Sequence, residues 1–135
     1  MQYWKIVAGH KERDPDETKS VVLGDWLRHN YVAIGWEETT DQGKQFKEGI
    51  QIQDRVVVVS DGFVWALGVI ESDMETFSLE QGSHLYPYQR KVTWSRVTRV
   101  AYRNFPHHLY NKLKSPKALV KLNSEDWESL LACLL

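Results

Sequence analysis

The chain has 135 residues, enough for one domain with a sizeable core that needs neither metals nor disulfides. Cys133 is its only cysteine, which excludes an internal disulfide and any cysteine-based zinc motif. The 17 basic and 18 acidic side chains nearly cancel, but they are distributed unevenly along the chain.

The positive charge is concentrated in one segment. Residues 81–123 contain nine Lys or Arg and no Asp or Glu, whereas residues 1–80 contain eight basic and fifteen acidic side chains. A basic segment in a near-neutral protein offers a face to a polyanion while the whole chain stays soluble. Nucleic-acid binding is one interpretation of this pattern. The other is a solvated surface whose acidic partners come from elsewhere in the fold.

The first thirty residues predict a strand, a loop and a short helix. Tyr3–Ala8 is expected to be a strand, and the charged residues 11–20, which include Pro15, an exposed loop. Asp25 is a typical N-cap for a short helix that extends through Asn30. With no charged leader and no apolar signal core at the start, we expect a cytoplasmic location.

The middle of the chain predicts a β-hairpin. Tyr31–Trp36 resembles a strand, and Thr39–Gly49 a polar loop or a short helix. The strand Val56–Val59, expected to begin in the alternating residues 50–53, is followed by Ser-Asp-Gly and then by the strand Phe63–Ile70, with the Asp-Gly pair typical of a type I′ turn. Four consecutive valines indicate a strand covered on both faces, and Gly68 indicates a bulge or a close backbone approach.

The last part predicts one more strand and a closing helix. Residues 73–88 are expected to be a long connection, and Arg90–Val100 a strand bent or bulged after Trp94. Residues 104–116 are expected to be irregular. The final helix, capped by Asn123 or Ser124, carries an apolar stripe. We therefore expect a mixed α/β domain: a small barrel of five or six strands with helices packed on its outside.

Catalytic and cofactor motifs are weak in this sequence. The histidines lack metal-ligand spacing, the glycines form no phosphate-binding loop, and Cys133 falls in the apolar stripe of the last helix. We expect a binding module without a cofactor rather than an enzyme.

Aromatic residues supply the binding candidates. Trp36 ends a strand beside Gly35, where an indole is well placed to line the mouth of a pocket. Tyr86 and Tyr88 flank Pro87 just before the basic strand, and either packing or a functional role fits them. Four other tryptophans are expected in the core: Trp4, Trp65, Trp94 and Trp127.

The order of these segments resembles a known family. A strand entering Gly-His is followed by YVAIGW, IQIQDRVVVV, a hairpin and VWALGVIES, and a Tyr/Pro loop then leads into YQRKVTW. Together they resemble the EVE/YTH-like branch of the PUA superfamily. More narrowly, they are similar to the N-terminal target-recognition domains of McrB-type modification-dependent restriction systems. The chain departs from the family at Gln53-Asp54, where members usually have Gly-Asp, and at Glu37-Glu38 after Gly35-Trp36.

The resemblance implies recognition of a modified, methylated base of DNA by flipping it into an aromatic cage. By position, Trp36 would be the main wall of the cage, with Tyr86 and Tyr88 from the loop that closes it. The remaining cage candidates are Gly9, His10, Ser60 and Asp61, of which Asp61 also fits a simple turn former. The phosphate candidates are Arg90, Lys91, Arg96 and Arg99, for which the solvated outer face of a barrel strand is the alternative.

The resemblance also implies partners. Such domains usually precede a GTP-hydrolysing AAA+ motor that recruits a nuclease, so residues 1–135 are expected to be a single recognition domain, either excised from a larger protein or standing alone. No membrane partner is expected. The alternatives are an RNA modified-base reader of the YTH or PUA type, and a module that binds a peptide or small metabolite.

Overall fold

The computed structural model describes residues 1–9, 16–35, 39–77 and 86–135, with side chains left out of the description for residues 16–20. The strands are β1 (Tyr3–Val7), β2 (Tyr31–Ile34), β3 (Arg55–Ser60), β4 (Phe63–Ile70), β5 (Glu75–Thr76), β6 (Tyr88–Ala101) and β7 (Leu119–Leu122). The helices are α1 (Asp16–His29), α2 (Asp41–Lys44), the π-helical turn η1 (Gln45–Gly49), α3 (His107–Leu113) and α4 (Ser124–Cys133).

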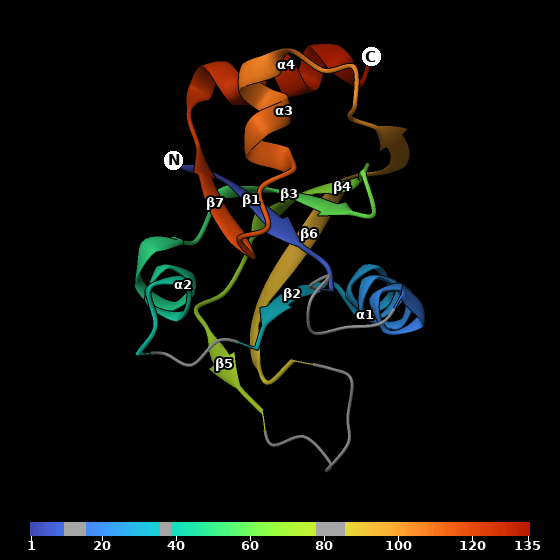
Figure 1. Cartoon of the computed structure of the whole chain (residues 1–135). Coiled ribbons are helices and arrows are strands. Elements are labelled where there is room, and N and C mark those ends of the chain that lie inside the picture. The colour runs from blue at the N-terminus through green and yellow to red at the C-terminus, as the bar shows by residue number, and fades with distance from the viewer. Residues whose placement is uncertain (10–15, 36–38, 78–85) are drawn as a thin grey trace.

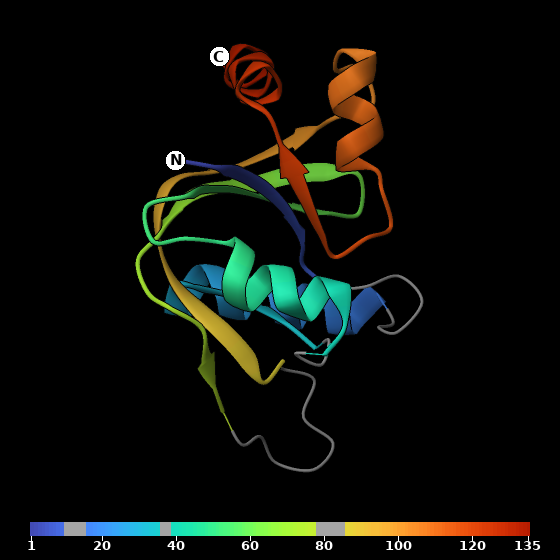
Figure 2. The same cartoon turned by 90° about the vertical axis from the view of Figure 1, so that its left-hand side faces the viewer.

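The strands form one curled sheet with the order β2-β6-β4-β3-β1-β7, and β5 pairs with the start of β6. Helices α1 and α2 lie on one side of it, and α3 and α4 on the other (Figures 1 and 2). The predicted mixed α/β class is confirmed, as a curled half-barrel sheet. Its helices cover both faces of the sheet, not the outside alone. The described residues form seven strands, whereas the sequence predicted five or six. The sequence analysis did not predict the short strands β5 and β7.

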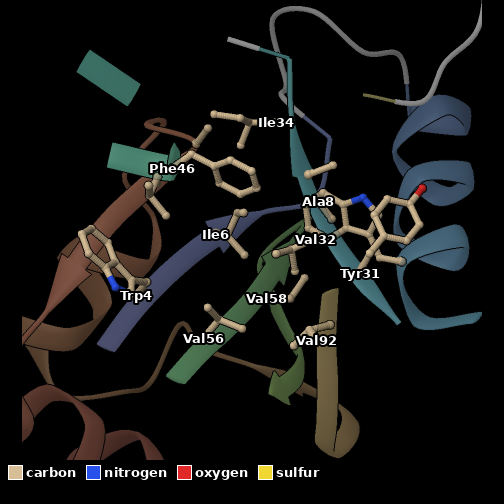
Figure 3. Packing of buried hydrophobic residues seen from close by; sticks show 14 of the residues in the cluster. Trp4, Ile6, Ala8, Tyr31, Val32, Ile34, Phe46, Val56, Val58 and Val92 are labelled. Carbon is tan, nitrogen blue, oxygen red and sulfur yellow. The ribbon is translucent and has the colours of Figure 1, made fainter. Parts of the chain in front are cut away.

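The two faces of the sheet bury separate apolar clusters. The inner core lies between the curled sheet, including its edge strand β2, and α1 and η1. Figure 3 shows Ile6 of β1, Val58 of β3 and Phe46 of η1 within it. The outer core lies against α3 and α4 and includes Leu109, Trp127 and other residues of those helices. The valines of β3 alternate between the cores, as predicted for a strand covered on both faces: Val56 and Val58 face inward, and Val57 and Val59 face outward.

The predicted hairpin joins β3 to β4. Asp61 and Gly62 have φ angles of 57° and 84°, the left-handed values that a type I′ turn needs at both central positions. The bulge expected after Trp94 is also present: the β4–β6 register shifts between Leu67 and Gly68, and again between Val64 and Ala66. Opposite Gly68, the side chains of Val92 and Trp94 approach so closely that a Cβ atom would lie 2.6 Å from Val92 Cγ2. The glycine therefore serves close strand packing.

Three local predictions were wrong. Helix α1 begins at Asp16 rather than near Asp25, because Pro15 precedes a helix start instead of marking a longer loop. Residues 107–113 form α3 rather than irregular chain, with Pro106 as its N-cap. Strand β3 begins only at Arg55, because Gln53 turns the chain with a φ of 79°, a left-handed value that favours glycine.

The aspartate next to that turn is an anchor. The buried carboxylate of Asp54 accepts hydrogen bonds from the backbone N–H of Gln2 (2.8 Å), the indole N–H of Trp4 (3.0 Å) and the backbone N–H of Gln51 (2.8 Å). These bonds tie the start of β1 to the start of β3, which fixes the parallel register in which Tyr3 lies opposite Arg55.

Lys5 is fully buried in β1. Its Nζ donates to the carbonyls of Ser115 (2.8 Å) and Lys117 (2.9 Å), so it holds the segment before β7 against the sheet. Burial lowers the pKa of Lys5 to about 7 because the charged ammonium is desolvated. A neutral amine still carries two N–H groups, enough for both carbonyls.

We expect Gly68→Ala to lower the free energy of unfolding by roughly 1–3 kcal/mol, because the new methyl group overpacks the β4–β6 contact. Gly24→Ala in α1 is the matched control: its Cβ would meet no atom within 4 Å, so unfolding should be unchanged or up to about 1 kcal/mol harder. Urea titrations measure both. Equal stability of the two variants would contradict the close approach at Gly68.

Stability should rise with pH between about 7 and 10. In this window Lys5 is protonated in the unfolded chain and largely neutral in the folded one, so the unfolded state binds more protons. The slope from one such group is at most about 1.4 kcal/mol per pH unit. Unfolding curves at several pH values would show it, and Lys5→Met should abolish this part of the dependence. A wild-type curve that is flat or falls over this range would contradict a depressed pKa.

Candidate nucleic-acid interface

The exit of β1 is fixed by the hairpin. The hydroxyl of Ser60 donates to the carbonyl of Ala8 (2.9 Å), and the N–H of Ala8 donates to the carbonyl of Val59 (3.0 Å). Gly9 follows with a φ of 80°, a left-handed turn that glycine adopts at little cost. Ser60 is itself buried, so what it offers a ligand is the position of the β1 exit rather than a surface hydroxyl.

The exit of β2 lies beside that of β1 and beside one tyrosine candidate. Ala8 packs in the inner core with Val32 and Ile34 (Figure 3). In the β2–β6 ladder Ile34 lies opposite Tyr88, and both Tyr86 and Tyr88 are half-buried against the inner core. Trp36 and His10, the two remaining ring candidates, lie outside the described residues.

Asp61 lies at the exposed tip of the hairpin. Its positive φ, between the paired residues Ser60 and Phe63, shows that it forms the turn. Burial is the main cause that raises the pKa of Tyr102, and the nearby Tyr110 and the Asp61 carboxylate raise it further. Its turn-forming role is therefore shown, and its place in a cage stays a prediction.

Arg90 corrects the sequence prediction. Its side chain is 1% exposed, and its guanidinium donates to the carbonyls of Ser72 (3.0 Å), Phe46 (2.9 Å) and Ile50 (2.6 Å). Desolvation lowers the pKa of Arg90, opposed by the carboxylates of Asp73 and Asp54. Because its guanidinium is enclosed and hydrogen-bonded to backbone, Arg90 does not bind phosphate; it holds η1 and the chain after β4 against β6.

The other three phosphate candidates of β6 are exposed. Lys91 lies opposite Tyr31 next to the β2 edge, Arg96 lies opposite Leu67 in the bulged part of the strand, and Arg99 lies farther along. No acidic residue occurs in β6, so these exposed cations have no acidic neighbour within their own strand.

Sequence reasoning missed an aromatic cluster beside Arg99. The Arg99 guanidinium carbon lies 4.7 Å from the centre of the Phe63 ring and 5.5 Å from that of Trp65. The two rings are tilted by 54°, with centroids 6.0 Å apart. We call Phe63, Trp65 and Arg99 the rim cluster. Trp65, expected in the core, packs against the inner core but is only half-buried. The second β6 bulge that places Arg99 near it had no signal in the sequence.

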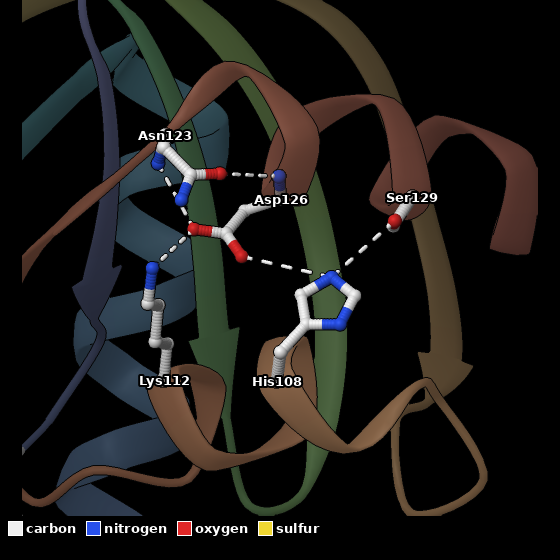
Figure 4. Close-up of polar contacts among 5 residues, drawn as sticks. All are labelled: His108, Lys112, Asn123, Asp126 and Ser129. Carbon is white, nitrogen blue, oxygen red and sulfur yellow. Dashed lines mark hydrogen bonds and ion pairs between the residues drawn. The ribbon is translucent and has the colours of Figure 1, made fainter.

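A polar group between α3 and α4 resembles a catalytic triad only in composition (Figure 4). Ser129 Oγ and Asp126 Oδ1 lie 3.4 and 3.7 Å from the same histidine nitrogen, Nε2 of His108, whereas a triad needs them on opposite nitrogens. The buried Asp126 also accepts from Lys112 Nζ (2.5 Å) and forms a capping box with Asn123. The group therefore joins two helices.

The described part of the chain shows neither a metal site nor a membrane-spanning helix. His, Cys, Asp and Glu side chains there do not gather in groups of three or more that could hold a metal ion. Among the helices of the same residues, none is both long and apolar enough to span a bilayer.

No protein-family model matches the chain, and no curated protein matches it. Solved structures do. The YTH domain of Zygosaccharomyces rouxii MRB1 in complex with N6-methyladenosine RNA has a TM-score of 0.65 at 15% identity, covering 97% of this chain and 84% of that one. The Mmi1 YTH domain with RNA has 0.60 at 9% identity (97% and 76%), and Agrobacterium tumefaciens Atu2648 has 0.61 at 10% identity (100% and 94%). The chain therefore has the YTH-like fold.

We expect Arg90→Met to lower the free energy of unfolding by about 3 kcal/mol, because three carbonyls lose their donor. Arg96→Met, an exposed neighbour on the same strand, should change it by less than about 0.5 kcal/mol. Thermal and urea unfolding measure both. If Arg90→Met is as stable as the wild type, the guanidinium does not hold these segments together.

Proposed function

We propose that this chain is a nucleic-acid recognition domain that flips a methylated base into an aromatic pocket where β1 and β2 end. One observation carries the proposal most: the YTH-like fold brings the exits of β1 and β2 together beside Tyr88, on the strand that carries the exposed basic residues. The segments predicted to form the pocket begin at these exits.

The energetics suit such a pocket. Flipping a base out of its stack costs a few kcal/mol. Each aromatic face that stacks on the base returns roughly 1–3 kcal/mol, and burying a methyl group adds about 0.8 kcal/mol. Two or three rings therefore offset the cost of flipping, and the methyl group decides between modified and plain bases.

The roles follow by position. Trp36 is the main wall, and Tyr86 and Tyr88 close the cage from the side of β6. Gly9 and His10 meet the edge of the base, and the buried Ser60 positions them through its bond to Ala8. Lys91, Arg96 and Arg99 take the phosphates and supply affinity that is independent of sequence.

We propose DNA as the substrate, on the resemblance of the ordered segments to McrB-type target-recognition domains. In that setting residues 1–135 form one recognition module without catalytic activity of its own. Its partners are an AAA+ GTPase motor and a nuclease subunit that cleaves the marked DNA.

RNA is the second candidate, and a specific observation favours it. Three of the solved structures with this fold are complexes with RNA, one of them carrying N6-methyladenosine. Duplex DNA must be opened before a base is flipped, whereas a single strand presents its bases at lower cost. Matched duplexes and single strands of both nucleic acids distinguish the two candidates.

We expect tight binding to an oligonucleotide with one methylated base and about fourfold weaker binding to its plain counterpart, because burying the methyl group is worth about 0.8 kcal/mol. Fluorescence anisotropy with 5-methylcytosine and N6-methyladenine probes, as DNA and RNA and as duplex and single strand, measures this. The affinity should fall steeply as salt rises, because phosphate contacts release counterions. If no probe binds at low salt, the proposed function is wrong.

Trp36→Ala should remove the preference for the methylated probe while the protein stays folded, because the main cage wall is lost. The matched control is Trp94→Phe on β6, whose indole donates to the carbonyl of Trp26 (3.2 Å) and which should keep the preference. Circular dichroism reports folding of both variants. If Trp36→Ala retains the full preference, Trp36 is not the wall.

A further inference from the structure

The rim cluster holds an arginine in a fixed place on an open surface. Arg99 and its neighbour Val97 are exposed, Val97 by 59%, whereas Phe63 and Trp65 are half-buried beneath the guanidinium. A guanidinium that stacks on aromatic rings keeps its N–H edge free for hydrogen bonds and loses less side-chain freedom on binding.

A bulge in β6 aims Arg99 at the rings. Val64 lies opposite Val100 and Ala66 opposite Val97, so Trp65 alone faces the two residues Thr98 and Arg99. The extra residue re-aims the strand, as bulges do near binding sites.

Hydrogen bonds connect this cluster to the proposed base pocket. The indole N–H of Trp65 donates to the carbonyl of Ser60 (2.9 Å), and the hydroxyl of Ser60 donates to the carbonyl of Ala8 (2.9 Å). Ala8 directly precedes Gly9, the first of the proposed base-contacting residues. These two hydrogen bonds connect the rim cluster to the end of β1 through a single residue, Ser60.

We propose that Arg99 contacts a phosphate directly adjacent to the flipped base, and that Phe63 and Trp65 are the positioning residues that hold it there. This inference rests on the proposed function and adds a location to it. The alternative phosphate ligand on β6, Arg96, has no such aromatic backing among the contacts of the described residues. The ligand at this cluster is the anionic backbone of a nucleic acid, because the exposed side chains of β6 include Arg96 and Arg99 and no acidic residue.

A double-mutant cycle tests the positioning. Arg99→Met should weaken binding of the preferred methylated probe about tenfold and reduce the salt slope by about one phosphate contact, with the methyl preference retained. Phe63→Leu should weaken binding several-fold in the wild-type background but not in the Arg99→Met background. Arg96→Met is the matched control: it should also reduce the slope, but its effect and that of Phe63→Leu should be independent.

A neutral backbone linkage tests the location. A methylphosphonate placed on either side of the methylated base removes the charge of one phosphate at a time. At one of the two positions it should weaken wild-type binding about tenfold and leave Arg99→Met unaffected, whereas several nucleotides away the two proteins should respond alike.

The outcomes separate the two proposals. If Arg99→Met binds as tightly as the wild type, or if Phe63→Leu is equally harmful in both backgrounds, the inference is overturned while the methyl preference of the wild type still supports the proposed function. Thermal melting checks that every variant is folded, and Phe63→Tyr, which keeps a ring beneath Arg99, should bind like the wild type. If no oligonucleotide binds the wild-type protein, the proposed function fails and the inference with it.

Discussion

The four valines of β3 are buried on both faces of the sheet, and the positions of the other elements follow from this constraint. Two valines face α1 and η1, and two face α3 and α4, so the strand cannot slip by one residue without exchanging the cores. Strand β1 runs parallel to it in register, and Val7 lies opposite Val59. The end of β1 is therefore held at the hairpin, where the proposed base site begins.

The number of Lys and Arg residues in a segment overstates how many of them can bind a polyanion. Of the nine basic residues in the segment 81–123, Arg90 is enclosed and binds backbone carbonyls. Lys112 pairs with the buried Asp126, Lys114 lies over Tyr110, and Lys121 lies over Trp4. Tertiary structure therefore encloses one cation of this acid-free segment and leaves others exposed, both in β6 and outside it, as at Arg103 and Lys117. Burial and pairing decide which cations remain accessible to a polyanion, and neither is written in the local sequence.

The likeness to YTH domains at 8–15% identity has a physical basis in the same constraint. A curled sheet with two cores needs apolar residues at alternate positions, a tight hairpin and room where strands cross closely, and many sequences meet these needs. Gln53 illustrates the tolerance: it adopts a φ of 79°, a backbone conformation that favours glycine, and the adjacent Asp54 still anchors the start of β3. Such substitutions alter identity without altering the fold.

The sequence by itself determined the mixed α/β class, the Asp61-Gly62 hairpin, the bulged strand after Trp94, the doubly covered β3 and the capped final helix, because each depends on short-range periodicity or turn chemistry. Tertiary structure decided the start of α1, the presence of α3 and β7, the burial of Arg90 and Lys5, and the rim cluster around Arg99. These depend on partners far away in the chain: Lys5 meets a carbonyl 110 residues later, and Arg90 reaches one 44 residues earlier. A local sequence pattern predicts the secondary structure around a residue. Only the neighbours packed around it in the fold decide whether its charge contacts water, the backbone or a ligand.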